Sequence, residues 1–114
     1  MKKTLKMAVN AEVRTMLEEL RSGLTRLYGN RLKRVLLYGS WARDEATADS
    51  DVDVAVVIEG SVVPGREIDY MLDLVTELGE KYDTLISVYP VSERNYRSIQ
   101  SPLLVNVRRE GVEV

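Results

Sequence analysis

The sequence predicts an α/β fold in which one small domain, residues 1–114, forms a short mixed β-sheet flanked by helices. Two observations predict it. Apolar residues recur at helical spacing in two long stretches, one near the N-terminus and one in the second half of the chain. Three shorter apolar stretches of strand length lie between and after these helices. A chain of 114 residues is also long enough to bury one hydrophobic core.

The first element is a helix that is expected to run from Asn10, its N-cap, to Gly29, its end. Its apolar side recurs at helical spacing in Val13, Met16, Leu17, Leu20, Leu24, Leu27 and Tyr28. A strand over residues 32–38 follows, and the Gly39-Ser40 pair after it is expected to form a turn that opens a short helix. The remaining expected elements are, in chain order, a strand over 51–59, a helix over 64–81, a strand over 84–91, a short helix capped by Ser92, a helix from Ser101-Pro102 to Glu110, and an edge strand in the final VEV.

Composition excludes several classes of site. The chain has no cysteine and no histidine, which removes disulfides, the usual zinc ligands and the usual general base. Any bound metal must therefore be a hard cation held by oxygen atoms, such as magnesium, manganese or calcium. The net charge of −2 argues against a protein that binds nucleic acid through a general positive surface.

The N-terminal sequence MKKTLKMAVNAEV does not have the pattern of a secretory signal peptide. Its apolar part is interrupted by Lys6 and Asn10 and does not reach the required 7–15 residues. The longest apolar run, residues 54–58, is far too short to cross a bilayer. We therefore expect a cytoplasmic protein.

The stretch between the first two strands carries the candidate chemistry. Gly39 lets backbone N–H groups approach a ligand closely at the end of a strand, and phosphate is favoured there. Asp51 and Asp53 are two residues apart, so both carboxylates face the same side of a strand. Their mutual repulsion is roughly 2–3 kcal/mol at an effective dielectric constant near 20, and a cation between them would reverse its sign. Nucleotidyl transfer requires N–H groups that hold the phosphates, facing two carboxylates that bind magnesium.

Simpler interpretations of the same residues exist. A Gly-Ser pair alone is usually a turn, and an Asp-x-Asp pair is usually a solvated strand end. The sequence DSDVD resembles the start of an EF-hand loop, but Val54 stands at the obligatory glycine and Gly60 at the bidentate glutamate. No Gly-Lys-Ser/Thr follows, which excludes a P-loop.

The pattern Gly-Ser-x10-Asp-x-Asp, within GSWARDEATADSDVDVAVV, resembles the nucleotidyltransferase superfamily that includes the DNA polymerase β fold. The short chain is similar to the minimal nucleotidyltransferase (MNT) group, which includes the MntA-type antitoxins of HEPN/MNT pairs. The resemblance implies that Gly39 and Ser40 hold the triphosphate of ATP and that the catalytic residues Asp51 and Asp53 bind Mg²⁺. It also implies that Arg43 supports the phosphate or the loop, whereas the simpler alternative is a surface ion pair of Arg43 with Asp44 or Glu45.

Two positions depart from the family pattern. Asp44 stands where family members commonly have glycine, and we expect its side chain to point away from the triphosphate. The family's third carboxylate lies on a later strand, and the matching position here is Ser87. Asp83 has the right parity but lies four residues earlier, about 13 Å along a strand, and is not expected to reach the site. Binding of a nucleotide is therefore better supported than turnover.

The resemblance implies three functions. The first is transfer of AMP from ATP to a tyrosine of a HEPN-domain ribonuclease toxin, so that this chain acts as its antitoxin. The second is an antitoxin that neutralises the HEPN toxin by binding alone. The third, transfer to an aminoglycoside or other small molecule, is weaker because such enzymes usually have a second domain for the acceptor. No direct contact with nucleic acid is expected.

Several apolar residues are candidates for a partner surface. They are Val62, Val63, Tyr96, Ile99, Leu103 and Leu104. The alternative for Leu103, Leu104 and Val107 is a packed amphipathic helix. Trp41, beside the phosphate turn, is open to three interpretations: stacking on a base, contact with a partner, or core packing.

Overall fold

A computed structural model describes residues 11–47 and 49–114. The expected N-cap Asn10 lies outside these residues. The elements are α2 (Ala11–Tyr28), a short 3-10 turn (Gly29–Arg31), β1 (Leu32–Tyr38), β2 (Val52–Ile58), α3 (Pro64–Lys81), β3 (Ile86–Ser92), α4 (Glu93–Ser98), α5 (Pro102–Glu110) and β4 (Val112–Glu113). Among the described residues, none of the helices has the length and apolar character needed to cross a membrane.

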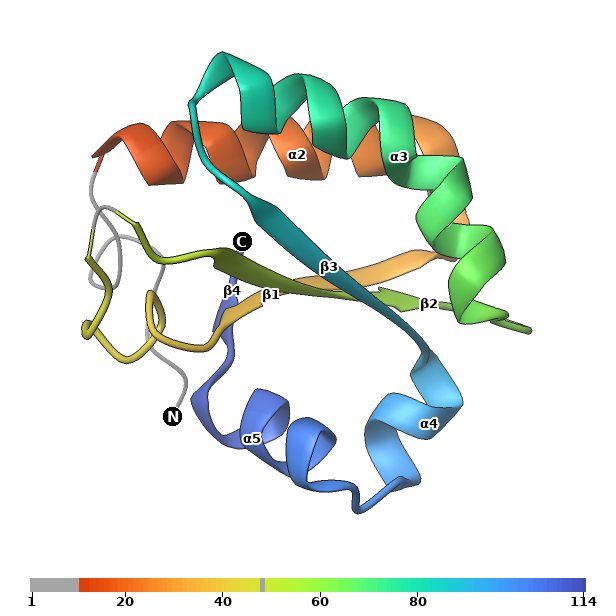
Figure 1. The fold of residues 1–114 in the computed structure, drawn as a ribbon. Coiled ribbons are helices and arrows are strands. Elements are labelled where there is room, and N and C mark those ends of the chain that lie inside the picture. The colour runs from red at the N-terminus through yellow and green to blue at the C-terminus, as the bar shows by residue number, and fades with distance from the viewer. Residues whose placement is uncertain (1–10, 48) are drawn as a thin grey trace.

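The four strands form one mixed sheet in the order β3-β2-β1-β4. β1 pairs antiparallel with β2 and with β4, whereas β2 pairs parallel with β3 across the connection made by α3. Helices α2 and α3 cover one face of the sheet, and α4 and α5 cover the other (Figure 1). The predicted α/β fold with a short mixed sheet between helices is therefore confirmed, including the edge strand at β4.

Alternation along β2 divides the core into two layers. Val52, Val54, Val56 and Ile58 are fully buried against α2 and α3. Ala55 and Val57 point the other way and pack with Leu104 and Val107 of α5. Because side chains alternate along a strand, Asp53 belongs to the α4/α5 face, one step beyond the part of β2 that these helices cover.

The helix caps agree with the sequence. The hydroxyl of Ser92 accepts a hydrogen bond from the Asn95 N–H at 3.1 Å, and that of Ser101 accepts one from the Leu104 N–H at 3.2 Å. β3 begins at Ile86, two residues after its expected start. β2 begins at Val52, one residue after its expected start, and ends at Ile58. Asp51 therefore lies just outside β2 rather than inside it.

Two of the expected surface candidates are part of the core. Leu104 and Tyr96 are buried, and Val107 of the same helix is fully buried with them. Leu103, Ile99 and Val63 remain exposed. The packed amphipathic helix is thus the correct interpretation of Leu104 and Val107.

Candidate active site

The chain leaves β1 through a tight turn at Gly39. Gly39 has a φ of +75°, a backbone conformation that glycine adopts without strain. The Arg43 N–H donates to the Gly39 carbonyl at 3.1 Å, and the Glu45 N–H donates to the Ser40 carbonyl at 2.9 Å. The prediction of a short helix here is wrong, because residues 40–44 form a turn that does not continue as a helix. It ends at Asp44, whose φ of +59° is outside the helical region and explains why glycine suits this position.

Gly39 lies directly against Asp53. Asp53 is paired across the sheet with Tyr38, the residue before Gly39. A Cβ atom built on Gly39 would lie 2.4 Å from Asp53 Oδ2, closer than any real contact of that kind. The absence of a side chain at position 39 leaves room for this carboxylate, which would have to move to make space for a Cβ atom.

Asp53 and Asp51 are electrostatically coupled. Burial raises the pKa of the half-buried Asp53 carboxyl above its ordinary value, the charge of Asp51 raises it further, and the charge of Arg43 opposes the shift. Such coupling is the repulsion that a divalent cation relieves. Two interacting carboxylates, one of them against a turn that a Cβ atom would fill, are a donor set that fits Mg²⁺, with water and phosphate oxygens as further ligands. No group of three or more acidic side chains that could hold a metal is found among the described residues.

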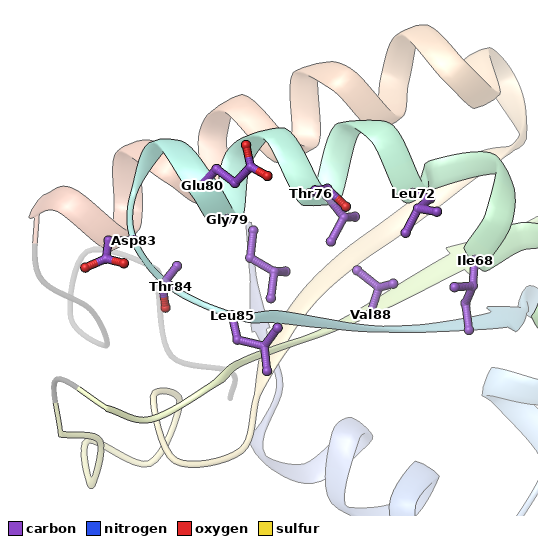
Figure 2. Close-up of a pocket in the computed structure, with 11 residues that line it drawn as sticks. Ile68, Leu72, Thr76, Gly79, Glu80, Asp83, Thr84, Leu85 and Val88 are labelled. Carbon is purple, nitrogen blue, oxygen red and sulfur yellow. The ribbon is translucent and has the colours of Figure 1, made fainter.

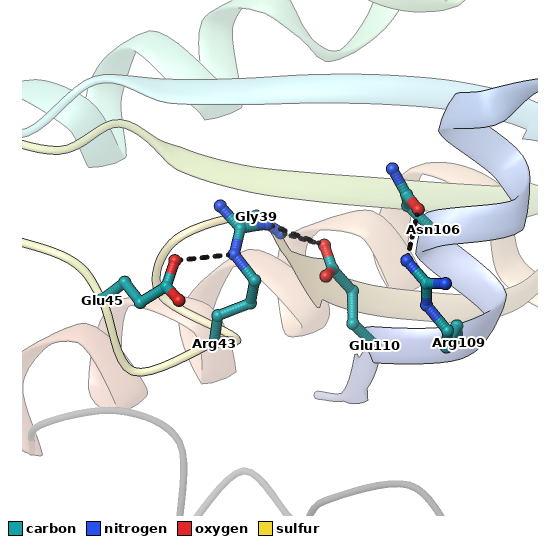
Figure 3. A network of polar contacts seen from close by, with 6 residues as sticks. All are labelled: Gly39, Arg43, Glu45, Asn106, Arg109 and Glu110. Atoms are coloured by element: carbon teal, nitrogen blue, oxygen red, sulfur yellow. Dashed lines mark hydrogen bonds and ion pairs between the residues drawn. The ribbon is translucent and has the colours of Figure 1, made fainter.

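Glu110, at the end of α5, connects the turn to the rest of the protein. One of its oxygens, Oε1, accepts hydrogen bonds from the Gly39 N–H at 3.2 Å and from Arg43 Nη1 at 3.1 Å (Figure 3). Arg43 Nε also donates to the exposed Glu45 at 2.9 Å. Arg43 therefore forms an ion pair with Glu45, as the simpler interpretation expected. Of the two roles that the resemblance implies for Arg43, its contacts favour support of the loop over support of the phosphate.

The sequence did not single out Glu110. One local signal was available, because a carboxylate in the last turn of a helix is disfavoured by the negative end of the helix dipole. Such a residue needs a cationic partner or a donor from elsewhere, and here it has both. The partners themselves lie 67 and 71 positions away and could not be found from sequence spacing.

Ser40 and Ser87 complete the surroundings of the two carboxylates. Within the part of the chain that the structure describes, the Ser40 hydroxyl makes no hydrogen bond. Ser87 pairs with Asp53 in the parallel ladder, which is the place expected for a third acid. Asp83 lies in the turn before β3, outside that ladder. The structure thus brings Gly39, Ser40, Arg43 and Asp53 together, with Asp51 just before β2 and close enough for its charge to act on Asp53.

Tyr38 is a further residue that sequence reasoning missed. Burial raises the pKa of its phenol to about 12, and the charge of Asp53 and the neighbouring Tyr89 add to the effect. Its hydroxyl therefore stays protonated at neutral pH and cannot serve as a base. Trp41 is half-buried against the core, and its indole N–H donates to the Ser50 carbonyl at 3.2 Å. Packing is therefore the interpretation of Trp41 that these contacts favour.

Comparison with known proteins places the chain in a class. The family model of the nucleotidyltransferase domain matches residues 17–109, so the chain belongs to this family. MJ0604 of Methanocaldococcus jannaschii, provisionally named a protein adenylyltransferase, is 34% identical over 96 residues, covering 83% of this chain and 90% of the relative. The predictions of this family and of an enzyme of the nucleotidyltransferase class are confirmed.

Solved structures share the fold. One chain, provisionally described as a minimal nucleotidyltransferase, is 28% identical with a TM-score of 0.62, covering 90% of this chain and 92% of that one. A chain of a toxin–antitoxin structure with AMP-PNP is 21% identical with a TM-score of 0.60, covering 84% of this chain and 70% of that one. At that identity the second likeness concerns the fold alone.

We expect Gly39→Ala to lower the free energy of unfolding by more than the cost of placing alanine in a backbone conformation with positive φ. Gly29 is the matched control, because it also has a positive φ, +56°, but has nothing within 4 Å of an added Cβ. Gly29→Ala should cost about 1–2 kcal/mol of unfolding free energy. Gly39→Ala should cost more, because the Asp53 carboxylate must move. Urea unfolding of both variants measures the difference, and equal costs would contradict the contact.

Asp53→Asn should stabilise the protein at neutral pH. A carboxyl group whose pKa is raised on folding binds its proton more tightly in the folded state, so stability falls as pH rises from the ordinary pKa of 3.8 through the folded value. Above that window the loss is complete. The variant should therefore be more stable than wild type at pH 7, with a gain that shrinks toward pH 3.8. Asp73→Asn, an exposed change on α3, is the control, and a less stable Asp53→Asn at pH 7 would refute the assignment.

Glu110→Gln tests the link between α5 and the turn. The amide oxygen can still accept from Gly39, but the charge opposite Arg43 is lost. We expect a loss of about 1 kcal/mol, the difference between a charged and a neutral hydrogen bond. Glu45→Gln removes the other carboxylate that pairs with Arg43. The Glu45 side chain is 63% exposed, against 18% for Glu110, so this variant should change stability by less than about 0.5 kcal/mol. A gain in stability on Glu110→Gln would mean that repulsion from the helix end dominates instead.

Proposed function

We propose that the protein transfers AMP from ATP, with Mg²⁺, to a hydroxyl group of a partner protein, and that the partner is a HEPN-domain toxin modified on tyrosine. The observation that carries the proposal is the contact between the Gly39 turn and the Asp53 carboxylate. In that contact a turn suited to phosphate lies directly against Asp53, one of the two carboxylates proposed here as metal ligands. The 34% identical relative, named for protein adenylyl transfer, supports the acceptor class. The shared fold with a toxin–antitoxin chain supports the partner.

Each residue has a defined role in this reaction. The Ser40 hydroxyl and the backbone of the turn hold the triphosphate, while Glu110 and Arg43 keep the turn in place. Asp51 and Asp53 would hold Mg²⁺, which supplies neutralisation of the charge on the phosphates. The acceptor oxygen forms a bond to the α-phosphorus, pyrophosphate leaves with the electrons of the broken P–O bond, and the acceptor proton passes to solvent.

Serine at position 87, where a third carboxylate was expected, favours a phenol as the acceptor. A tyrosine hydroxyl has a pKa of about 10 and gives up its proton far more readily than an aliphatic alcohol does. Positioned acid–base help is typically worth 10²- to 10⁴-fold in rate. Proximity and charge neutralisation remain without it. A slow transfer is sufficient for a partner that stays bound.

Ser87 also supports a second candidate function. With serine beside Asp53, the chain would neutralise the toxin by binding alone and use the nucleotide site weakly or not at all.

Mg²⁺ with ATP should stabilise the wild-type protein, by about 2.7 kcal/mol at a hundred times the Kd. The double variant Asp51→Asn/Asp53→Asn should fold but lose this gain, because the metal ligands are gone. Thermal unfolding with and without Mg²⁺ and ATP measures both. If the double variant keeps the full gain, the two carboxylates do not bind the metal.

Transfer is tested with ATP labelled in its α-phosphate and a co-expressed HEPN-type partner. Wild type should label the partner, and Ser87→Asp should do so faster because a third carboxylate is restored. The binding-only alternative predicts no label at any time, together with full neutralisation of the toxin by the double variant.

A further inference from the structure

An apolar groove runs between α3 and β3. Its volume is about 670 Å³, and it is lined from α3 by Ile68 and Leu72, from β3 by Val88, and from the segment just before β3 by Leu85 (Figure 2). Leu85 is 65% exposed, Leu72 51% and Ile68 39%. Exposure of three large apolar side chains around one hollow is unusual for a surface that faces only water.

The groove borders an open edge of the sheet. β3 is the outer strand in the sheet that the described residues form, with β2 on its inner side only. An edge strand presents unpaired N–H and C=O groups, to which an extended polypeptide can add as a further strand. The apolar groove would then receive alternate side chains of the added strand.

The other face of β3 leads to the candidate active site. Val88 lines the groove, so its neighbour Ser87 points to the opposite face, where it lies beside Asp53. Ser87 is small and exposed. A strand added to β3 would therefore place one set of side chains in the groove and the other set on the face of the two carboxylates.

We propose that the acceptor protein binds as an added strand on β3, with apolar side chains in the groove and its acceptor hydroxyl reaching over Ser87 toward Asp53. The proposal rests on the proposed function and specifies how the acceptor is recognised. Two strand spacings separate the added strand from β2, about 9.6 Å between backbones. Only tyrosine, the longest hydroxyl side chain, suits such a span, and the small Ser87 leaves its path clear.

Charge defines one end of the acceptor segment. Glu80, from α3, and Asp83, from the turn before β3, both line the end of the groove where β3 begins (Figure 2). A basic residue of the segment would be favoured there. The occupant is therefore an extended segment with apolar residues at alternate positions, a tyrosine between two of them, and a basic flank.

The experiment uses the full chain and the synthetic peptide Lys-Thr-Val-Tyr-Val-Thr-Val-Lys. Amide hydrogen exchange of β3 is measured with and without peptide, and label transfer from ATP is measured in parallel. We expect the peptide to slow exchange of β3 amides at least tenfold. Methylating the alternate peptide amides that face β3 should abolish this protection, whereas methylating the other set should not.

Leu85→Asp and Leu72→Asp place a charge in the groove at exposed positions, so the fold should be kept. Leu103→Asp, at a 39% exposed leucine of α5, is the matched control. The groove variants should lose peptide protection and label transfer at least tenfold, while the control and the stabilisation of all three by Mg²⁺ and ATP stay unchanged.

The outcomes separate this proposal from the proposed function. Protection of β3 without label transfer would leave the docking surface standing and refute the transferase activity. Unchanged exchange in β3, or groove variants that behave like the control, would overturn the docking proposal. So would concentration-dependent protection of β3 without peptide together with a dimer in sedimentation, because a second copy would then occupy the groove.

Discussion

The site depends on the close approach of a backbone turn to a carboxylate. The antiparallel register of β1 and β2 puts Tyr38 opposite Asp53, so the residue after Tyr38 must pass over that carboxylate. Glycine is the residue that can do so, both for its positive φ and for the space that its missing side chain leaves. The loop that begins at Ser40 leaves the sheet through this turn. The same turn brings Arg43 into contact with Glu110.

The two faces of β2 have different tasks. The face toward α2 and α3 carries four fully buried side chains of the core. The other face is covered by short helices that reach Ala55 and Val57 but leave Asp53 half-buried. A carboxylate at such a boundary is held firmly by its strand yet remains within reach of solvent and ligands. This placement explains how one short strand supports both stability and a charged site.

Much of this arrangement could be predicted because its signals are local. Helical periodicity located α2 and α3, and serine caps located α4 and α5. The match to the family pattern located Ser87, which pairs with Asp53. The missed features depend on distant contacts or on single backbone angles. Glu110 reaches Gly39 only because β4 pairs with β1 directly after α5. The turn at residues 40–44 ends at the φ of Asp44, which no periodicity reveals.

Trp41 gives the protein a built-in optical probe. It is the only tryptophan in the chain, and it lies in the loop that joins the Gly39 turn to Asp51 and Asp53. Its indole N–H bridges to Ser50, so the ring connects the first and last parts of that loop. Indole emission depends on the hydrogen bonding and hydration of the ring. Rearrangement of the loop around a nucleotide would therefore change the intrinsic fluorescence of the unmodified protein, without any attached dye.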